Sequence, residues 1–377
     1  MKFSQVIGQQ EIINKLRHSV AEERVSHAQI FAGPEGNGKL AIALAFARYI
    51  SCDNRGEEES CGTCPSCVKY DKMIHPDLHF VFPVFKKNKA TDPISEHFIA
   101  EWREMVGKSP YLNLSQWLSF IGVENEQGLI YASEASEIIK KLSLKPYESD
   151  YKVMIIWLPE KMHTVTANKL LKMIEEPPEK TLFLLVSEEP DAILPTIMSR
   201  CQFMRVPAIS NDAVSAALSK KFDLPAMKAD NIASSARGNF VRAVNLVEQD
   251  EERVRHLERF INLMRSAYSR NVLSLNEWAE DIATAGREAQ KRFLVYCLAQ
   301  VRENLVMNLT HDHAKLVNLA PDEEEFALKF NSFITPSNVE PISAEFTLAH
   351  SHISSNGNAR IIFLDLALKM VRLVRQG

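Results

Sequence analysis

A glycine-rich loop, residues 33–40, constrains the fold of this chain more than any other feature. Its sequence, Gly-Pro-Glu-Gly-Asn-Gly-Lys-Leu, fits the pattern G-x-x-x-x-G-K, in which backbone amides and a lysine cradle phosphate groups. A short apolar run, residues 28–32, leads into the loop, and residues 40–50 continue with helical spacing. A strand, a glycine loop and a helix in that order predict a doubly wound α/β fold. The candidate phosphate-binding residues are Gly33, Gly36, Gly38 and Lys39.

Further apolar runs predict the other strands of a parallel sheet. They span residues 78–82, 152–157 and 181–186, and one more strand is expected at 202–206. Continuous apolar runs suit strands that are buried on both faces. Residues 166–176 have helical spacing that ends before a pair of prolines, which cannot continue a helix.

After residue 207 the pattern is helical throughout. Residues 208–250 suit a small helical bundle, and residues 251–377 carry apolar stripes with helical spacing. We therefore expect an α/β domain over 1–207, a small helical domain over 208–250 and an all-α domain over 251–377. The stripes indicate core packing, with an oligomer interface as the alternative.

The residues that ATP hydrolysis requires are missing from their expected places. Leu40 stands where Ser or Thr would offer Mg²⁺ a hydroxyl. Trp157 and Leu158 end a predicted strand where two acids would hold Mg²⁺ and polarise water, and Glu160 lies too far along the chain to replace them. We therefore expect ATP binding to be weak or absent. The same losses predict that the chain has no intrinsic ATPase activity.

The net charge and the first residues limit the class of protein and the compartment in which we expect it. A net charge of −4 argues against a strongly basic nucleic-acid-binding protein. The sequence begins without an apolar signal region, and no stretch approaches the roughly 20 apolar residues of a membrane span. We expect a cytoplasmic protein with no membrane partner, where cysteines stay reduced.

Four cysteines, Cys52, Cys61, Cys64 and Cys67, predict a metal site. The last three form C-x-x-C-x-x-C, and thiolates at such spacing converge on Zn²⁺. A redox pair of Cys64 and Cys67, and an iron–sulfur cluster held by all four, are the alternatives. We favour a structural zinc module over residues 52–67, because a short module of four thiolates usually serves folding.

A series of motifs together resembles the delta-prime family of bacterial DNA polymerase III clamp-loader subunits, which are AAA+ proteins. The motifs are Val6-Ile7-Gly8-Gln9, the glycine loop, the four cysteines, His75-Pro76-Asp77, Ala167-Asn168-Lys169-Leu170-Leu171-Lys172, Glu175-Glu176-Pro177-Pro178 and Ser199-Arg200-Cys201. The resemblance covers residues 1 to about 250 well. It is weaker beyond, where Asn358-Ala359-Arg360 and the next helix are similar to the family's final helix.

The resemblance implies a fold and a role. The fold is a RecA-like AAA+ domain with a zinc module, then a helical lid (208–250) and a helical collar (251–377) that joins a ring of subunits. The role is that of a non-hydrolysing clamp-loader subunit of the DNA polymerase III holoenzyme, part of a DNA-directed DNA polymerase complex in replication. Implied partners are the motor subunits tau and gamma, the delta subunit, the sliding clamp and primed DNA. Arg200 would act in trans as an arginine finger at a neighbouring subunit's ATP site.

The chain departs from the family pattern in two places. Val241 stands where AAA+ lids place a sensing arginine, and Arg242 follows it. Residues 84–127 look like an insertion, which we expect to form an extra helical element at the surface. Its basic run, residues 86–89, is expected to be a solvated loop, with a patch that contacts DNA as the alternative.

Two other functions compete with this one. An active tau- or gamma-like ATPase motor would need Ser or Thr at position 40 and acids at positions 157 and 158. A stand-alone zinc-dependent enzyme acting on nucleic acid would need an open metal position, whereas four thiolates close the coordination shell.

Overall fold

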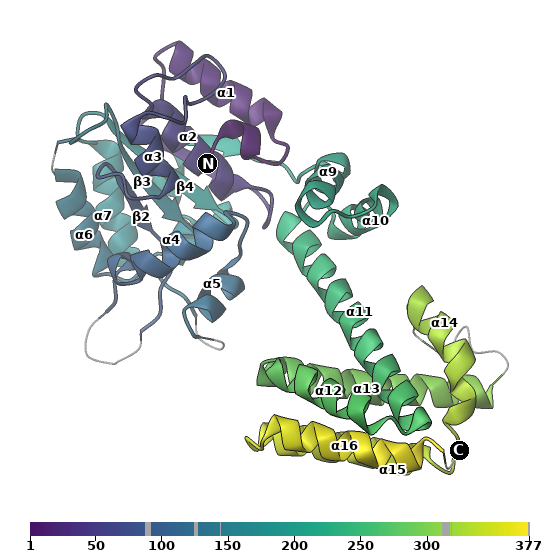
Figure 1. The fold of residues 1–377 in the computed structure, drawn as a ribbon. Coiled ribbons are helices and arrows are strands. Elements are labelled where there is room, and N and C mark those ends of the chain that lie inside the picture. The colour runs from purple at the N-terminus through teal and green to yellow at the C-terminus, as the bar shows by residue number, and fades with distance from the viewer. Residues whose placement is uncertain (87–91, 124–126, 144, 311–316, 318, 376–377) are drawn as a thin grey trace. The chain divides into compact units, whose positions relative to one another are not determined.

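A computed structural model describes residues 1–86, 92–123, 127–143, 145–310, 317 and 319–375 of the chain. These residues divide into two units, Met1–Val247 and Glu248–Gly377. The strands belong to the first unit, and the second is helical (Figure 1). The long helix α11, Phe240–Ser269, contributes its first turns to one unit and the rest to the other.

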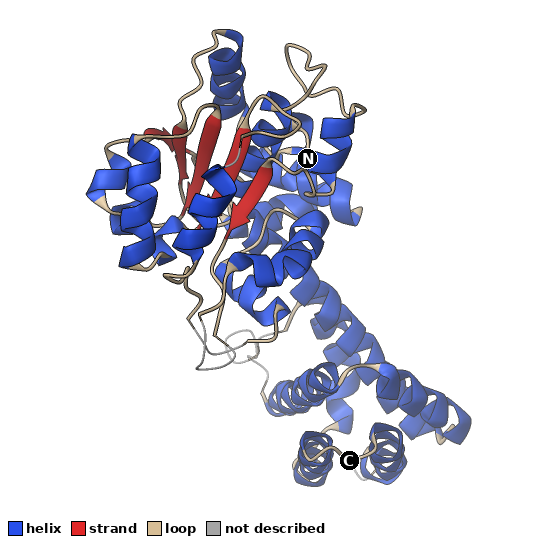
Figure 2. Ribbon diagram, turned by 90° about the vertical axis from the view of Figure 1, so that its left-hand side faces the viewer, coloured by secondary structure: helices blue, strands red, loops and turns tan. Residues whose placement is uncertain are grey.

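A five-stranded parallel sheet organises the first unit; its strands are drawn in red in Figure 2. The strand order is β2-β3-β4-β1-β5. The strands are β1 Ala28–Ala32, β2 Leu78–Val81, β3 Lys152–Trp157, β4 Thr181–Ser187 and β5 Gln202–Arg205. Every residue of β1, β3 and β4 is buried, which explains why their sequences are continuous apolar runs. The predicted strands are confirmed to within one residue at each end.

Helices cover both faces of this sheet. On one face lie α1 Gln10–Ala21, α2 Lys39–Ile50, α3 Pro65–Asp71, α4 Ile99–Lys108 and α5 Leu114–Phe120. On the other face lie α6 Glu134–Ser143, α7 Thr164–Glu175 and α8 Pro195–Met198. Short 3₁₀ turns span Phe3–Gln5, Ser95–Phe98, Pro159–Lys161 and Pro190–Ala192. The predicted α/β fold with a parallel sheet is confirmed.

A small helical cluster completes the first unit. It consists of α9 Asn211–Phe222, α10 Ala226–Ala236 and the first turns of α11. Its core is separate from those of the sheet and contains Val214, Leu218, Ala233 and Phe240. The side chain of Ser210 caps α9 by accepting a hydrogen bond from Ala213 N at 3.3 Å.

The second unit is a helical bundle around one core. Besides the remainder of α11 it contains α12 Val272–Thr284, α13 Arg287–Leu309, α14 Pro321–Phe330, a 3₁₀ turn Asn331–Phe333, α15 Val339–Ser354 and α16 Ala359–Leu373. α13 packs along α15, and α12 packs along α16. Most of the apolar residues of the predicted stripes lie in this core, which confirms core packing as their main role. No helix among the described residues is long and apolar enough to cross a bilayer.

The segment expected to be a surface insertion is helical, but it is not confined to the surface. Trp102 on α4 and Trp117 on α5 are fully buried, and both contact Phe82 just after β2. Trp117 Nε1 also donates a hydrogen bond to Pro83 O at 2.8 Å. The segment therefore forms part of the core on one face of the sheet, because its two tryptophans pack against Phe82 next to β2. Residues 87–89 of the basic run lie outside the described residues.

Candidate functional site

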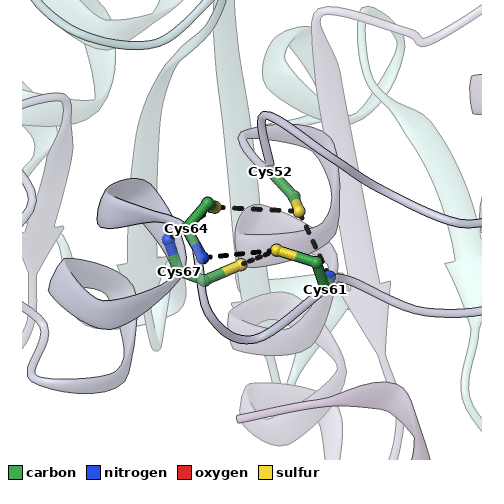
Figure 3. Close-up of side chains that lie close together, drawn as sticks. All are labelled: Cys52, Cys61, Cys64 and Cys67. Atoms are coloured by element: carbon green, nitrogen blue, oxygen red, sulfur yellow. Dashed lines mark hydrogen bonds between the residues drawn. The ribbon is translucent and has the colours of Figure 1, made fainter.

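The four predicted metal ligands converge just after α2 (Figure 3). Their sulfur atoms all lie within 4.8 Å of one another. The Cys52–Cys64 and Cys61–Cys67 sulfur pairs are each 4.0 Å apart. Four sulfurs bound tetrahedrally to zinc at about 2.3 Å would lie about 3.8 Å apart. The arrangement thus fits a metal such as zinc.

Local backbone structure aims the thiols at this point. Cys64 caps the start of α3, and its sulfur accepts a hydrogen bond from Cys67 N at 3.4 Å. The sulfur of Cys61 accepts one from Cys64 N, also at 3.4 Å. Backbone donors, that of Thr63 above all, lower the pKa of Cys61 to about 6, whereas burial raises the pKa of Cys52 to about 12. Amide donors aimed at sulfur favour the thiolate form that metals bind.

The phosphate loop has the predicted place between β1 and α2, and its lysine is turned inward. The side chain of Lys39 is only 4% exposed. Its Nζ donates to Pro34 O at 2.6 Å and to Asn37 Oδ1 at 3.0 Å, and Glu188 Oε1 lies 3.9 Å away. Burial lowers the pKa of Lys39 to about 8 and raises the pKa of Glu188 to about 7. The ammonium group of Lys39 therefore already donates hydrogen bonds to oxygens of the loop itself.

Tyr111, which follows α4, lies over the phosphate loop. A Cβ atom at Gly38, where φ is +87°, would be 3.0 Å from Tyr111 Cε1. Tyr111 Oη accepts a hydrogen bond from Ile7 N at 2.7 Å, and its ring lies 5.0 Å from that of Phe240. The hollow left beside the loop has a volume of about 20 Å³, whereas ligand pockets usually have about 300–1,000 Å³. Tyr111 therefore leaves little room beside Gly38 on this side of the loop.

A second contact holds the loop from the helical cluster. Phe240 N donates a hydrogen bond to Gly36 O at 3.0 Å. Asn239 Nδ2 donates to Glu35 Oε1 at 3.1 Å, and a Cβ atom at Gly36 would clash with Asn239 Oδ1 at 1.9 Å. Gly36 is thus required for this close approach.

Trp157 and Leu158, at the end of β3, offer no ligand for Mg²⁺. Trp157 and Leu158 are 2% and 1% exposed, and Trp157 packs against Trp102 at 5.2 Å between ring centroids. Glu160 Oε1 instead accepts hydrogen bonds from the backbone of Glu188 and Glu189, at 2.8 and 3.1 Å. Its carboxylate therefore organises the loop after β4.

Arg200 lies just after α8 with its guanidinium 40% exposed. Its Nη2 is 2.9 Å from Glu175 Oε1 at the end of α7, and its Nη1 donates to Thr196 O at 3.0 Å. Cys201 beside it is half-buried, and burial raises the pKa of its thiol to about 12. The cysteine is thus less accessible than Ser199 and Arg200, which are both exposed.

The sequence pattern located the loop, the cysteines and Arg200, but it missed the groups that close the loop. Tyr111 was visible only as an aromatic residue within an insertion, and Asn239 as a polar residue between two helices. No motif or spacing relates either residue to the loop, so only their three-dimensional positions assign them a role.

One family model and several known proteins are similar to this chain. The family described as "DNA polymerase III, delta subunit" matches residues 8–210. In Bacillus subtilis, DNA polymerase III subunit delta′ is 28% identical over 243 residues, which are 64% of this chain and 60% of the relative. DNA polymerase III subunit tau of the same organism is also 28% identical, over 253 residues, which are 66% of this chain and 37% of the relative. The matched segments therefore span less than two thirds of either relative. A solved DNA polymerase III gamma subunit-related protein of Thermotoga maritima is 14% identical with a TM-score of 0.34, covering 96% of this chain and 99% of its own.

Proposed function

This chain belongs to the DNA polymerase III delta-subunit family, and from that premise we propose that it is a non-hydrolysing clamp-loader subunit. In this role it helps to load the sliding clamp onto primed DNA during replication. The observation that carries the proposal is the closed phosphate loop, in which Tyr111 covers Gly38 and Lys39 is bound by the loop itself.

Electrostatics around the loop support the same conclusion. Glu188, Glu160 and Glu35 lie close enough to Lys39 to counteract the effect of burial on its pKa. A triphosphate brought to this place would meet several carboxylates and one cation. Mg²⁺ normally offsets such charge, but Leu40 provides no hydroxyl for it and Trp157 and Leu158 provide no carboxylate. Binding of ATP would therefore be weak or absent, and hydrolysis would lack its catalytic groups.

The similarity to tau is also compatible with an alternative role, that of an active ATPase motor. Identity to tau and to delta′ is equal, so it favours neither role. The side chains at positions 40, 157 and 158 favour the non-hydrolysing role, because each lacks the oxygen that the motor's chemistry needs.

In the proposed complex, Arg200 serves the ATP site of an adjacent tau or gamma motor subunit. A guanidinium placed beside the γ-phosphate would stabilise the charge that develops during hydrolysis. Residues 208–250 would form the lid, and residues 251–377 the collar that holds this chain beside tau or gamma and delta. A zinc ion held by Cys52, Cys61, Cys64 and Cys67 would fix the module in its folded form without taking part in chemistry.

Two measurements on the intact chain test this proposal. The purified protein should hydrolyse ATP no faster than background, and it should co-purify with a tau- or gamma-type motor subunit when the two are expressed together. ATP turnover by the isolated chain would refute the non-hydrolysing role. Failure to associate with the motor subunit would refute membership of the complex.

A further inference from the structure

A second concave surface lies in the first unit, beyond the ring of Tyr111 from the phosphate loop. The cleft has a volume of about 1,070 Å³. Its walls are the segment before α1, the ends of α2, α3 and α4, and the outer face of α9. Its size suits a short stretch of polymer, since compact ligand pockets usually have about 300–1,000 Å³.

Basic side chains outnumber acidic ones in the lining of the cleft. Five basic side chains and one acidic side chain line it: Lys2, Arg48, Lys108, Lys220, Lys221 and Asp71. Asp71 is already neutralised, because its Oδ1 lies 2.6 Å from Arg48 Nη1. The remaining cations leave the cleft positive in a chain whose net charge is −4.

Two of the cations lie at one end of the cleft, beside Gly62. A Cβ atom at Gly62 would lie 2.9 Å from Lys2 Nζ and 3.1 Å from Arg48 Nη2, so both cations approach one point. Arg48 is 3% exposed, and its Nε is buried without a hydrogen-bond partner among the described residues. Because the protein encloses this Nε and Asp71 pairs with Nη1, Lys2 is the more accessible of the two cations to a ligand.

The opposite wall carries two more cations, on the last turn of α9. Lys220 is exposed and has no ion pair with any residue that the structure describes. Lys221 Nζ lies 5.9 Å from the ring centroid of Phe240 and 5.1 Å from that of Phe222. Lys108 is held by Glu104 at 2.7 Å, an exposed pair of little strength. Both ends of the cleft therefore offer cations to an anionic ligand.

Apolar side chains also line the cleft. Its partly exposed apolar residues include Ile7, Pro110 and the alanines of α9, whereas Val6, Leu44, Met73 and Val106 are at most 8% exposed. Of the aromatic residues that border it, Tyr70 and Phe240 are 4% and 3% exposed, and Tyr111 is partly exposed. Single-stranded nucleic acid usually stacks successive bases on several exposed rings combined with cations. One partly exposed ring does not form such a series, and the surface instead matches carboxylates next to apolar side chains.

We propose that this cleft binds an acidic peptide segment of a partner protein, with carboxylates at its two basic ends and apolar side chains next to them. Such a site adds a protein-docking role to the proposed clamp-loader function and does not depend on it.

The test uses the intact chain and random dodecapeptides displayed on phage. Peptides selected on the wild-type protein should be enriched in Asp and Glu next to apolar residues. Synthetic copies of the selected peptides should bind about tenfold or more weakly to a Lys220→Glu, Lys221→Glu double variant. The Lys169→Glu, Lys172→Glu double variant carries the same charge change on exposed positions of α7 and should bind as the wild type does.

Three results would overturn the proposal. The first is a set of selected peptides with no excess of acidic residues. The second is equal binding to the wild type and to the α9 double variant, or equal loss in the α7 control. The third is oligothymidylate that binds more tightly than the peptides and is lost in the α9 variant alone, which would assign the cleft to nucleic acid.

Discussion

The guanidinium of Arg200 is paired with the carboxylate of Glu175, with 2.9 Å between Nη2 and Oε1. The pair joins the second residue after α8 to the last residue of α7. Both side chains are more than a third exposed, at 40% and 38%, so solvent screens their attraction. The contact orients the arginine but would release it at small energetic cost when a stronger anion approaches.

Replacing Arg200 tests the proposed role in trans. In an assembled complex, Arg200→Ala should lower the ATPase activity that DNA and clamp stimulate, while leaving assembly intact. The fall should be partial because only one motor site loses a finger that elsewhere contributes about 10³–10⁵ in rate. Arg200→Lys should not restore activity, because an ammonium lacks the planar fork of donors. Equal stimulated rates in wild-type and Ala complexes would show that Arg200 is an ordinary surface residue.

Glu175→Gln provides the matched control at the same contact. It removes the charge that holds the guanidinium but keeps the finger itself. Since exposed ion pairs contribute about 0.2–1 kcal/mol, stimulated ATPase activity should change less than about fivefold. A loss as large as that of Arg200→Ala would mean that the pair itself, and not the finger, supports the activity.

Tyr111→Ala should open the phosphate loop. Without the ring over Gly38, a fluorescent ATP analogue should bind more tightly than to the wild type, as measured by anisotropy. Hydrolysis should stay at background because Leu40, Trp157 and Leu158 are unchanged. Tyr111→Phe keeps the ring and should remain closed, although it loses the hydrogen bond from Ile7 N. A folded Ala variant with unchanged nucleotide affinity would contradict the closure by this side chain.

Zinc content tests the cysteine module. Elemental analysis of protein purified without chelator should find one zinc per chain, and Cys64→Ser should lower that content. The same variant should speed amide hydrogen exchange in residues 52–70 while sparing the sheet, because the module is small and local. Cys201→Ser, outside the cluster, should retain the metal. Wild-type protein without zinc would refute the assignment.

His79 on β2 should make the stability of the protein depend on acid pH. Burial, aided by Lys141 and Lys152, lowers the pKa of His79 from 6.5 to about 4. Between these values the unfolded chain binds more protons than the folded one, so stability is lost as the pH falls from 6.5 toward 4. The loss from this one group is up to about 3 kcal/mol.

Urea unfolding at pH 7.5 and pH 5 measures that effect. His79→Gln should lose less stability between the two pH values than the wild type, whereas the exposed His97→Gln should match the wild type. Identical losses in wild type and His79→Gln would show that other groups account for the acid sensitivity.

Much of the first unit follows from local sequence pattern. Residues 153–157 and 182–186 are apolar at consecutive positions, which is typical of strands buried on both faces, and the structure has strands there. The thiols of Cys61, Cys64 and Cys67 lie so near one another in the chain that their spacing alone brings them together. The absence of oxygen ligands at Leu40, Trp157 and Leu158 is likewise a property of the sequence itself.

Only the tertiary structure decided what lies against these elements. Tyr111 meets Gly38, Asn239 meets Gly36 and Arg200 meets Glu175, in each case from a different element of the fold. The burial of Trp102 and Trp117, within a segment expected at the surface, also depends on such packing. Spacing along the chain predicts contacts within a helix, a strand or a short loop, because the backbone's periodicity fixes them. Contacts between distant segments depend on how the whole core packs, and no local pattern encodes them.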